Sequence, residues 1–169
     1  MDIDGIRFLD WLSGFVDGEG SFTVIRKNRR RSSGFVCDFR LCVRDDDCMV
    51  IEEIKRHTGI GKVEYSKSYG KRHERHGHPQ VSWRVYTKAD CRALIRILDR
   101  NPLRTKKARD YGIWRTAVLH WVAMPSWGTK LRNWAAVAAL KAELENGRRY
   151  RSSLEITRRA NSTQELLAL

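Results

Sequence analysis

Two carboxylates lie close together at the end of a helical segment near the N-terminus. Asp17 and Glu19 alternate with glycines at the end of the run Leu12-Ser13-Gly14-Phe15-Val16-Asp17-Gly18-Glu19-Gly20. An acid at a helix C-terminus faces the negative end of the helix macrodipole, so local rules disfavour both side chains there. A carboxylate kept in such a place usually has a cation as its partner. We therefore expect the chemistry of this chain at the end of this helix.

The same run also has the features of an ordinary core helix. Apolar residues recur at helical spacing, namely Trp11, Leu12, Phe15 and Val16, and a glycine-rich ending is typical of a C-cap. That interpretation does not explain Gly14, which costs a helix interior about 1 kcal/mol relative to alanine. Gly14 shares a helix face with Asp17 and Gly18, and small residues on one face allow a second helix backbone to approach. The pattern therefore favours a functional helix that meets another helix.

Charge and composition indicate a polyanionic partner. The 169 residues carry a formal net charge of +13, with a pI near 10.1, and such an excess is most easily explained by phosphate binding. The charge is concentrated in two loop-like stretches, 26–31 and 70–75. No apolar run has the length of a transmembrane span or of a signal-peptide core, so we expect no membrane association.

Cysteine and histidine usage points to an intracellular protein without a zinc site. The four cysteines show no C-x-x-C spacing, which is typical of reduced thiols. Three histidines, His73, His76 and His78, form a short cluster. It lacks paired cysteines, so a solvated or phosphate-facing loop is favoured over a metal site. The excess of arginine over lysine favours a bacterial cytoplasm, with an organelle as the alternative.

The periodicity of the chain predicts a mixed α+β fold with one antiparallel sheet. Helices are expected over 5–17, 48–57, from an N-cap at Asp90 to the stop at Asn101-Pro102, over 105–122 and over 130–145. Strands are expected over 21–27, 37–44, 62–69 and 80–86. Gly59 is expected to cap the second helix. We expect one domain over 1–147 and a basic tail over 148–169.

The strands alternate apolar and polar residues, which assigns their faces. Residues expected to face the core are Cys37, Phe39, Leu41, Val43, Val63, Tyr65, Val81, Trp83 and Val85. The polar residues between them would lie on the opposite, exposed face.

The first motif and the order of elements resemble the LAGLIDADG homing endonucleases, and the resemblance extends over about 5–119. Two weaker matches support it, Gly59-Ile60-Gly61-Lys62-Val63 and Pro102-Leu103-Arg104-Thr105-Lys106-Lys107. The resemblance implies an α-β-β-α-β-β-α core whose four-stranded sheet binds double-stranded DNA, followed by extra C-terminal helices. It also implies an intron-encoded, site-specific hydrolase that makes double-strand breaks with the help of a metal.

The resemblance assigns roles to individual residues. Glu19 and the Gly18 carbonyl would bind Mg²⁺, with Mn²⁺ as a substitute, because this cation prefers oxygen ligands and keeps most of its waters. Lys106 would stabilise negative charge, or would be an ordinary phosphate contact. Asp45 would organise solvent, or would cap the following helix. Glu19 stands where the family more often has aspartate, and Ser13 where it has alanine, so metal preference and rate stay open.

Because only one copy of the motif is present, a homodimer is expected, with Ser13, Gly14 and Asp17 at the contact between the two motif helices. Each sheet would lie in the major groove over one half of a long pseudo-palindromic target. The residues expected to read bases are Thr23, Ile25, Lys27, Asp38, Arg40, Cys42, Glu64, Ser66, Ser82 and Arg84. Those expected to bind phosphate from loops are Arg29, Arg30, Lys71 and Arg72.

Three other functions remain as alternatives. A maturase acting on intron RNA, or a regulator that binds DNA without cutting it, would have the same charge and fold. A generic RNA-binding domain would need stacking aromatics on the exposed sheet face, whereas the strand aromatics are expected to point inward. The presence of Glu19 favours cleavage, because a pure binder has no need of an acid facing phosphate.

Overall fold

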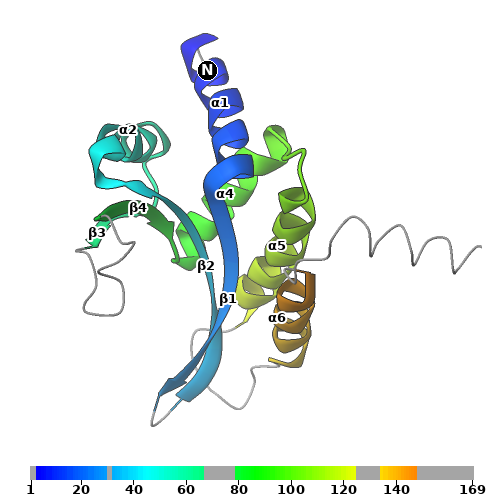
Figure 1. The fold of residues 1–169 in the computed structure, drawn as a ribbon. Coiled ribbons are helices and arrows are strands. Elements are labelled where there is room, and N and C mark those ends of the chain that lie inside the picture. The colour runs from blue at the N-terminus through cyan, green and yellow to red at the C-terminus, as the bar shows by residue number, and fades with distance from the viewer. Residues whose placement is uncertain (1–2, 30–31, 67–78, 125–133, 148–169) are drawn as a thin grey trace, which may run out of the picture.

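The computed structural model describes residues 3–29, 32–66, 79–124 and 134–147 (Figure 1). Its elements, in chain order, are α1 (Ile3–Glu19), β1 (Gly20–Arg29), β2 (Ser32–Arg44), a 3-10 turn η1 (Asp45–Asp47), α2 (Cys48–Thr58), β3 (Lys62–Ser66), β4 (Gln80–Val85), α4 (Lys88–Arg100), α5 (Lys107–Ala123) and α6 (Ala135–Gly147). The mixed α+β class is confirmed. No helix in these ranges combines the length and apolarity needed to cross a membrane.

The four strands form one antiparallel sheet in the order β1-β2-β4-β3. β1 and β2 pair over their length, from Gly20 opposite Leu41 to Arg29 opposite Ser32. β4 pairs with β2 only between Phe39 and Arg44. The outer half of the β1–β2 hairpin therefore has no β4 beside it, and it extends past the helices at the bottom of Figure 1.

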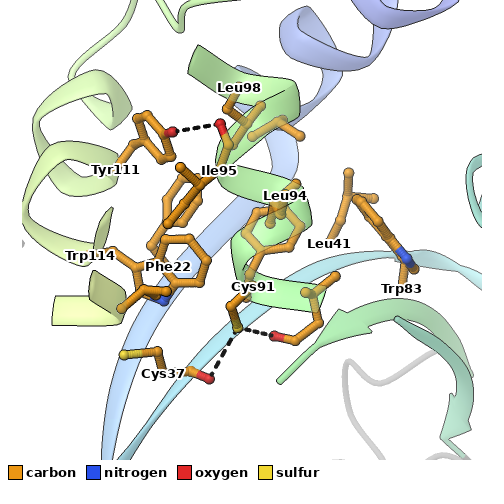
Figure 2. Close-up of a cluster of buried hydrophobic side chains, with 14 of the residues drawn as sticks. Phe22, Cys37, Leu41, Trp83, Cys91, Leu94, Ile95, Leu98, Tyr111 and Trp114 are labelled. Atoms are coloured by element: carbon orange, nitrogen blue, oxygen red, sulfur yellow. Dashed lines mark hydrogen bonds between the residues drawn. The ribbon is translucent and has the colours of Figure 1, made fainter. Parts of the chain in front are cut away.

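The helices cover one face of the sheet and enclose a single core. Inward strand residues such as Phe39, Leu41 and Trp83 are fully buried there, which confirms the predicted alternation on β2 and β4. Phe22 packs against Trp114 of α5, with ring centroids 5.3 Å apart (Figure 2). Burial of these aromatic and aliphatic side chains supplies most of the driving force for folding.

Two local expectations were wrong. Tyr65 lies on the edge strand β3, and its side chain is 62% exposed instead of inward-facing. Its hydroxyl donates to Glu52 of α2 at 3.0 Å, so the phenol lies along the outside of that helix. The N-cap of α4 is Thr87, not Asp90, because the Thr87 hydroxyl accepts a hydrogen bond from the Asp90 N–H.

Several predictions lie outside the described residues. They are the basic tail 148–169, the histidine cluster His73, His76 and His78, and the phosphate contacts Arg30, Lys71 and Arg72. The division into a domain over 1–147 and a tail stays a prediction.

The turn from α2 into β3 depends on two glycines with positive φ, and they differ in the space around them. Gly59 has φ +69° and nothing within 4 Å of an added Cβ, whereas Gly61 has φ +73° and a Cβ there would lie 2.6 Å from Trp83 Nε1. That nitrogen donates to the Ile60 carbonyl at 2.8 Å. Gly61 is therefore restricted both by its backbone conformation and by close packing.

We predict that Gly61→Ala lowers the free energy of unfolding by about 3 kcal/mol or more, since it adds a core clash to backbone strain. The matched variant Gly59→Ala has the strain alone and should cost about 1–2 kcal/mol. Urea denaturation followed by tryptophan fluorescence measures both. Equal costs would contradict the packing argument.

Candidate functional site

The motif acid Glu19 lies at the last position of α1, where the chain turns into β1. Its side chain is exposed and makes no hydrogen bond or ion pair with any other described residue. It borders a hollow on the flank of α1 that is lined by Phe15, Glu19, Cys42, Val43, Arg44, Asp47 and Val50. An exposed carboxylate that makes no direct hydrogen bond or ion pair with a described residue, beside the open face of a sheet, is available to a ligand.

Lys107 is the lysine that reaches the motif. Its Nζ donates to the Gly18 carbonyl at 2.5 Å. Burial lowers the pKa of Lys107, while the charges of Glu19 and Asp17 act to raise it. The carbonyl expected to bind a metal is therefore occupied by an ammonium group in the single chain.

The expected lysine, Lys106, lies one position before the lysine that contacts the motif, and its role stays a prediction. Lys106 is exposed and directly precedes α5, and the structure gives it no contact with Gly18 or Glu19. The motif segment contains both lysines, and only the point where α5 begins decides which one turns toward α1. The sequence expectation placed that start at 105, two residues before the observed one.

Asp17 holds the connection between α4 and α5. Its carboxylate accepts a hydrogen bond from the Arg104 N–H at 2.7 Å and from the Thr105 hydroxyl at 2.9 Å, with a longer contact to the Thr105 N–H. Ser13 acts one turn earlier, since its hydroxyl donates to the Asn101 carbonyl at 2.8 Å. Both side chains were expected at a dimer contact, which stays a prediction; within the chain they bind the α4–α5 connection that leads to Lys107.

The outer face of α1 remains without cover in the described chain. A Cβ added to Gly14 or to Gly18 would meet nothing within 4 Å. Trp11, on the same side of the helix, is 42% exposed and stacks on Phe15 at 5.2 Å. Nothing inside the described chain therefore requires glycine at these two positions.

Asp45 does not cap α2, and its expected role in organising solvent stays a prediction. It opens η1, and its backbone N–H donates to the Pro79 carbonyl at 3.1 Å. The N-cap position of α2 belongs to Asp47, whose side chain makes no capping bond. Asp47, rather than Asp45, lines the hollow beside Glu19. The sequence run Asp45-Asp46-Asp47 gives no signal by which Asp47 could have been chosen over Asp45.

Most of the expected base-reading residues lie together on the face of the sheet opposite the helices. Thr23, Ile25, Lys27, Arg40, Cys42, Glu64, Ser66 and Arg84 are half-buried or exposed there, whereas Asp38 and Ser82 are buried among their neighbours. Arg29 ends β1. Two residues of this face are locked by neighbouring chain atoms. The Thr23 hydroxyl donates to the Asp38 carbonyl at 3.1 Å, and Asp38 pairs with Arg84.

The oxygen atoms at the end of α1 fit a hard divalent cation. One carboxylate, Glu19, and one carbonyl, Gly18, suit magnesium, which keeps several waters and needs few protein ligands. Among the described residues no group of three or more histidine, cysteine, aspartate or glutamate side chains is close enough to form a complete site. A single chain would therefore supply only part of a coordination shell.

The Asp17 bonds generate a stability prediction with a defined pH dependence. Burial acts to raise the pKa of Asp17, but the Arg104 and Thr105 hydrogen bonds and the Lys107 charge outweigh it, so this pKa lies below its ordinary value of 3.8. A group with a lowered pKa stabilises the fold above its unfolded pKa, and this contribution is lost as pH falls through the folded value.

Asp17→Asn should therefore lower the free energy of unfolding at pH 7 by about 1 kcal/mol, a value reduced for partial exposure. The difference from wild type should shrink as the pH falls below about 4. Urea denaturation across this range tests it, with Asp10→Asn on the exposed side of α1 as the control. A difference that is independent of pH would show that the carboxylate charge is not responsible.

Comparison with known proteins agrees with this arrangement. A family model described as LAGLIDADG endonuclease matches residues 12–118, well over half of the chain. A probable intron-encoded endonuclease, Cox1-I1b of Schizosaccharomyces pombe, is 29% identical over 113 residues, which cover 66% of this chain and 27% of that protein. The chain thus spans about a quarter of the length of this curated relative.

Solved structures share the fold. An archaeal intron-encoded homing endonuclease, I-Vdi141I in complex with DNA, has a TM-score of 0.67 at 20% identity, covering 87% of this chain and 89% of the other. I-SmaMI, bound to uncleaved DNA target in the presence of calcium ions, has a TM-score of 0.66 at 22% identity, covering 87% of this chain and 47% of the other. These likenesses show a shared fold, and the family model, which matches well over half of the chain, shows that the chain belongs to the LAGLIDADG endonuclease family.

Proposed function

We propose that this protein is a site-specific DNA endonuclease that hydrolyses phosphodiester bonds with the help of a divalent metal. The observation that carries the proposal is the meeting of Glu19, the Gly18 carbonyl and Lys107 at the end of α1. This group borders the open face of the sheet. The curated relative is named an intron-encoded endonuclease, and the solved neighbours are DNA complexes, which supports DNA as the substrate.

The chemistry of the site suits this reaction. A bound divalent cation lowers the pKa of a water molecule and neutralises charge on phosphate. Glu19 and the Gly18 carbonyl would hold magnesium, with manganese as a substitute. Lys107 would leave the carbonyl and donate to the phosphate oxygens, because its ammonium already lies at this end of α1. The Asp17 bonds fix the backbone that presents Lys107.

We further propose that two copies act together through the outer faces of their α1 helices. Gly14 and Gly18 have open space around them, so two backbones could approach closely there, and the exposed Trp11 would be covered. A twofold contact uses the same surface on both copies. It would bring two Glu19 carboxylates together and complete the partial coordination shell of each chain, giving one cut on each strand.

The sheets of such a dimer would lie in the major groove of two neighbouring half-sites. Residues on the outer face, such as Arg40 and Cys42, would contact base edges. Arg29 and the loop cations Arg30, Lys71 and Arg72 would bind phosphate in a sequence-independent, salt-sensitive manner. The target would accordingly be long and approximately palindromic.

Glu19→Gln should abolish magnesium-dependent cleavage while DNA binding and the fold persist. The amide keeps the size of the side chain but loses the charge that binds the cation, so we expect a loss of about a hundredfold or more in cleavage rate. The assay incubates the protein with a plasmid library of randomised sites, with magnesium or with EDTA, and sequences the cut ends.

The control is Glu53→Gln, which removes an exposed acid from α2 and should cleave like wild type. Comparable cleavage by Glu19→Gln would reject the role of Glu19. Sites that wild type binds but never cuts would favour a binding protein on the same fold.

Gly14→Leu should separate the two copies without unfolding either. A Cβ added at Gly14 meets nothing within 4 Å in one chain, and leucine is the better helix former, so we expect the larger side chain to obstruct an approaching helix. Light scattering after size exclusion should give twice the chain mass for wild type and a single mass for the variant.

Gly112→Leu on α5 is the matched control, because it is also a helical glycine with open space around it. It should remain dimeric. A monomeric wild type, or a Gly14→Leu protein that keeps the doubled mass, would contradict the proposed contact.

A further inference from the structure

A row of three cations crosses the exposed face of the sheet. Arg84 of β4 lies directly opposite Arg40 of β2 and, on its other side, opposite Lys62 of β3. Like charges in directly opposed positions destabilise a sheet. Two acids on the same face, Asp38 and Glu64, compensate the row. Such an arrangement requires an explanation beyond a general need for positive charge.

The strongest contact of this group joins Arg84 to Asp38. Arg84 Nε donates to Asp38 Oδ1 at 2.6 Å, and the Asp38 side chain is only 7% exposed. A charge-assisted bond of this length is among the stronger hydrogen bonds in proteins. A buried carboxylate that lost its arginine would stay desolvated and unpaired. The bond therefore fixes the position of the Arg84 guanidinium and directs its Nε side toward Asp38.

The other contacts of Arg84 are weaker. Its Nη1 lies 3.4 Å and 3.5 Å from the two Glu64 oxygens, and Glu64, which is 37% exposed, also accepts from Arg40 at 3.3 Å. The Tyr86 ring centroid lies 5.1 Å from the guanidinium carbon. Glu64 is thus a shared and exchangeable partner, while Asp38 is a fixed one. Arg84 Nη2 has no hydrogen-bond partner among the described residues.

We propose that Asp38 is a positioning residue that holds Arg84 to read one guanine in each half-site. Guanine offers the acceptors N7 and O6 in the major groove, and an arginine fork can bond both. Arg84 would meet them with Nη2 and with Nη1, which Glu64 releases. Asp38 itself, buried behind the guanidinium, would not contact a base. This inference rests on the proposed DNA-binding function.

A phosphate contact is the alternative for Arg84, and the charges oppose it. Arg84 and Arg40 are both paired with the acids Asp38 and Glu64, which leaves Lys62 as the one uncompensated cation of the row among the described residues, so Arg84 itself would gain little from a phosphate. Arg84 instead offers two donors, Nη1 and Nη2, in a guanidinium plane that Asp38 fixes. Sequence is read through the geometry of such donors at base edges and not through charge. Lysine at this position would keep the charge and lose the fork.

The experiment selects bound sequences from a randomised duplex library in EDTA, so that binding is measured apart from cleavage. Arg84→Ala identifies the base pair at which preference disappears, and wild type should show guanine there. Asp38→Asn should reduce the preference for guanine at this pair by about tenfold and leave the other pairs unchanged. Arg84→Lys should also reduce the preference for guanine at this pair, although Asp38 keeps a cationic partner. This variant provides the test if Asp38→Asn does not fold.

The control is Asp99→Asn, which removes an acid from an arginine pair with Arg115 on the helical layer, and all base preferences should survive it. An Asp38→Asn or Arg84→Lys protein that still selects guanine as wild type does would overturn the inference alone. So would an Arg84→Ala protein with unchanged preferences. A wild type that enriches no sequence would overturn the proposed function together with the inference.

Discussion

The Asp17 carboxylate is the interaction on which the site depends. It accepts hydrogen bonds from the connection between α4 and α5, which lies more than eighty residues further along the chain. Together with the Ser13–Asn101 bond, it holds the α4–α5 connection against α1. Because it is in place, Lys107 reaches the Gly18 carbonyl and Glu19 is left exposed beside it. The motif acids thus divide into Asp17, which binds another segment of the chain, and Glu19, which is exposed.

The exposed sheet face shows how a strongly basic protein limits its own repulsion. A net charge of +13 opposes compaction, and three cations stand side by side across the strands. Asp38 pairs with Arg84 and Glu64 pairs with Arg40, so two of these cations are neutralised. The charge that remains uncompensated is available to phosphate, while the compensated arginines are restricted in direction. The same face can in this way separate affinity from selectivity.

Features that depend on local pattern were predictable from the sequence. Alternation on β2 and β4 assigned Cys37, Phe39, Trp83 and Val85 to the core, and Gly59 marked the end of α2, where its φ is +69°. Tyr65 was misplaced because periodicity does not show that β3 is an edge strand. Lys106 was chosen over Lys107 because the start of a helix is uncertain by a residue or two.

Contacts between distant segments could not be predicted. Nothing in the motif indicates that Ser13 and Asp17 turn toward the α4–α5 connection instead of toward a second helix. The alternation placed Asp38 and Arg84 on one face, but their pairing depends on the register of β2 and β4. Registers and helix crossings are properties of the whole fold, and one sequence specifies them only through the packing of its core.

The measurement that tests the central claim most directly is the position of the cuts on both strands of a selected target, mapped by sequencing the ends. Two copies joined through α1 should produce magnesium-dependent breaks in both strands, at equivalent positions of two half-sites related by twofold symmetry. Binding without cuts, or cuts confined to one strand, would contradict the account of a paired Glu19 site.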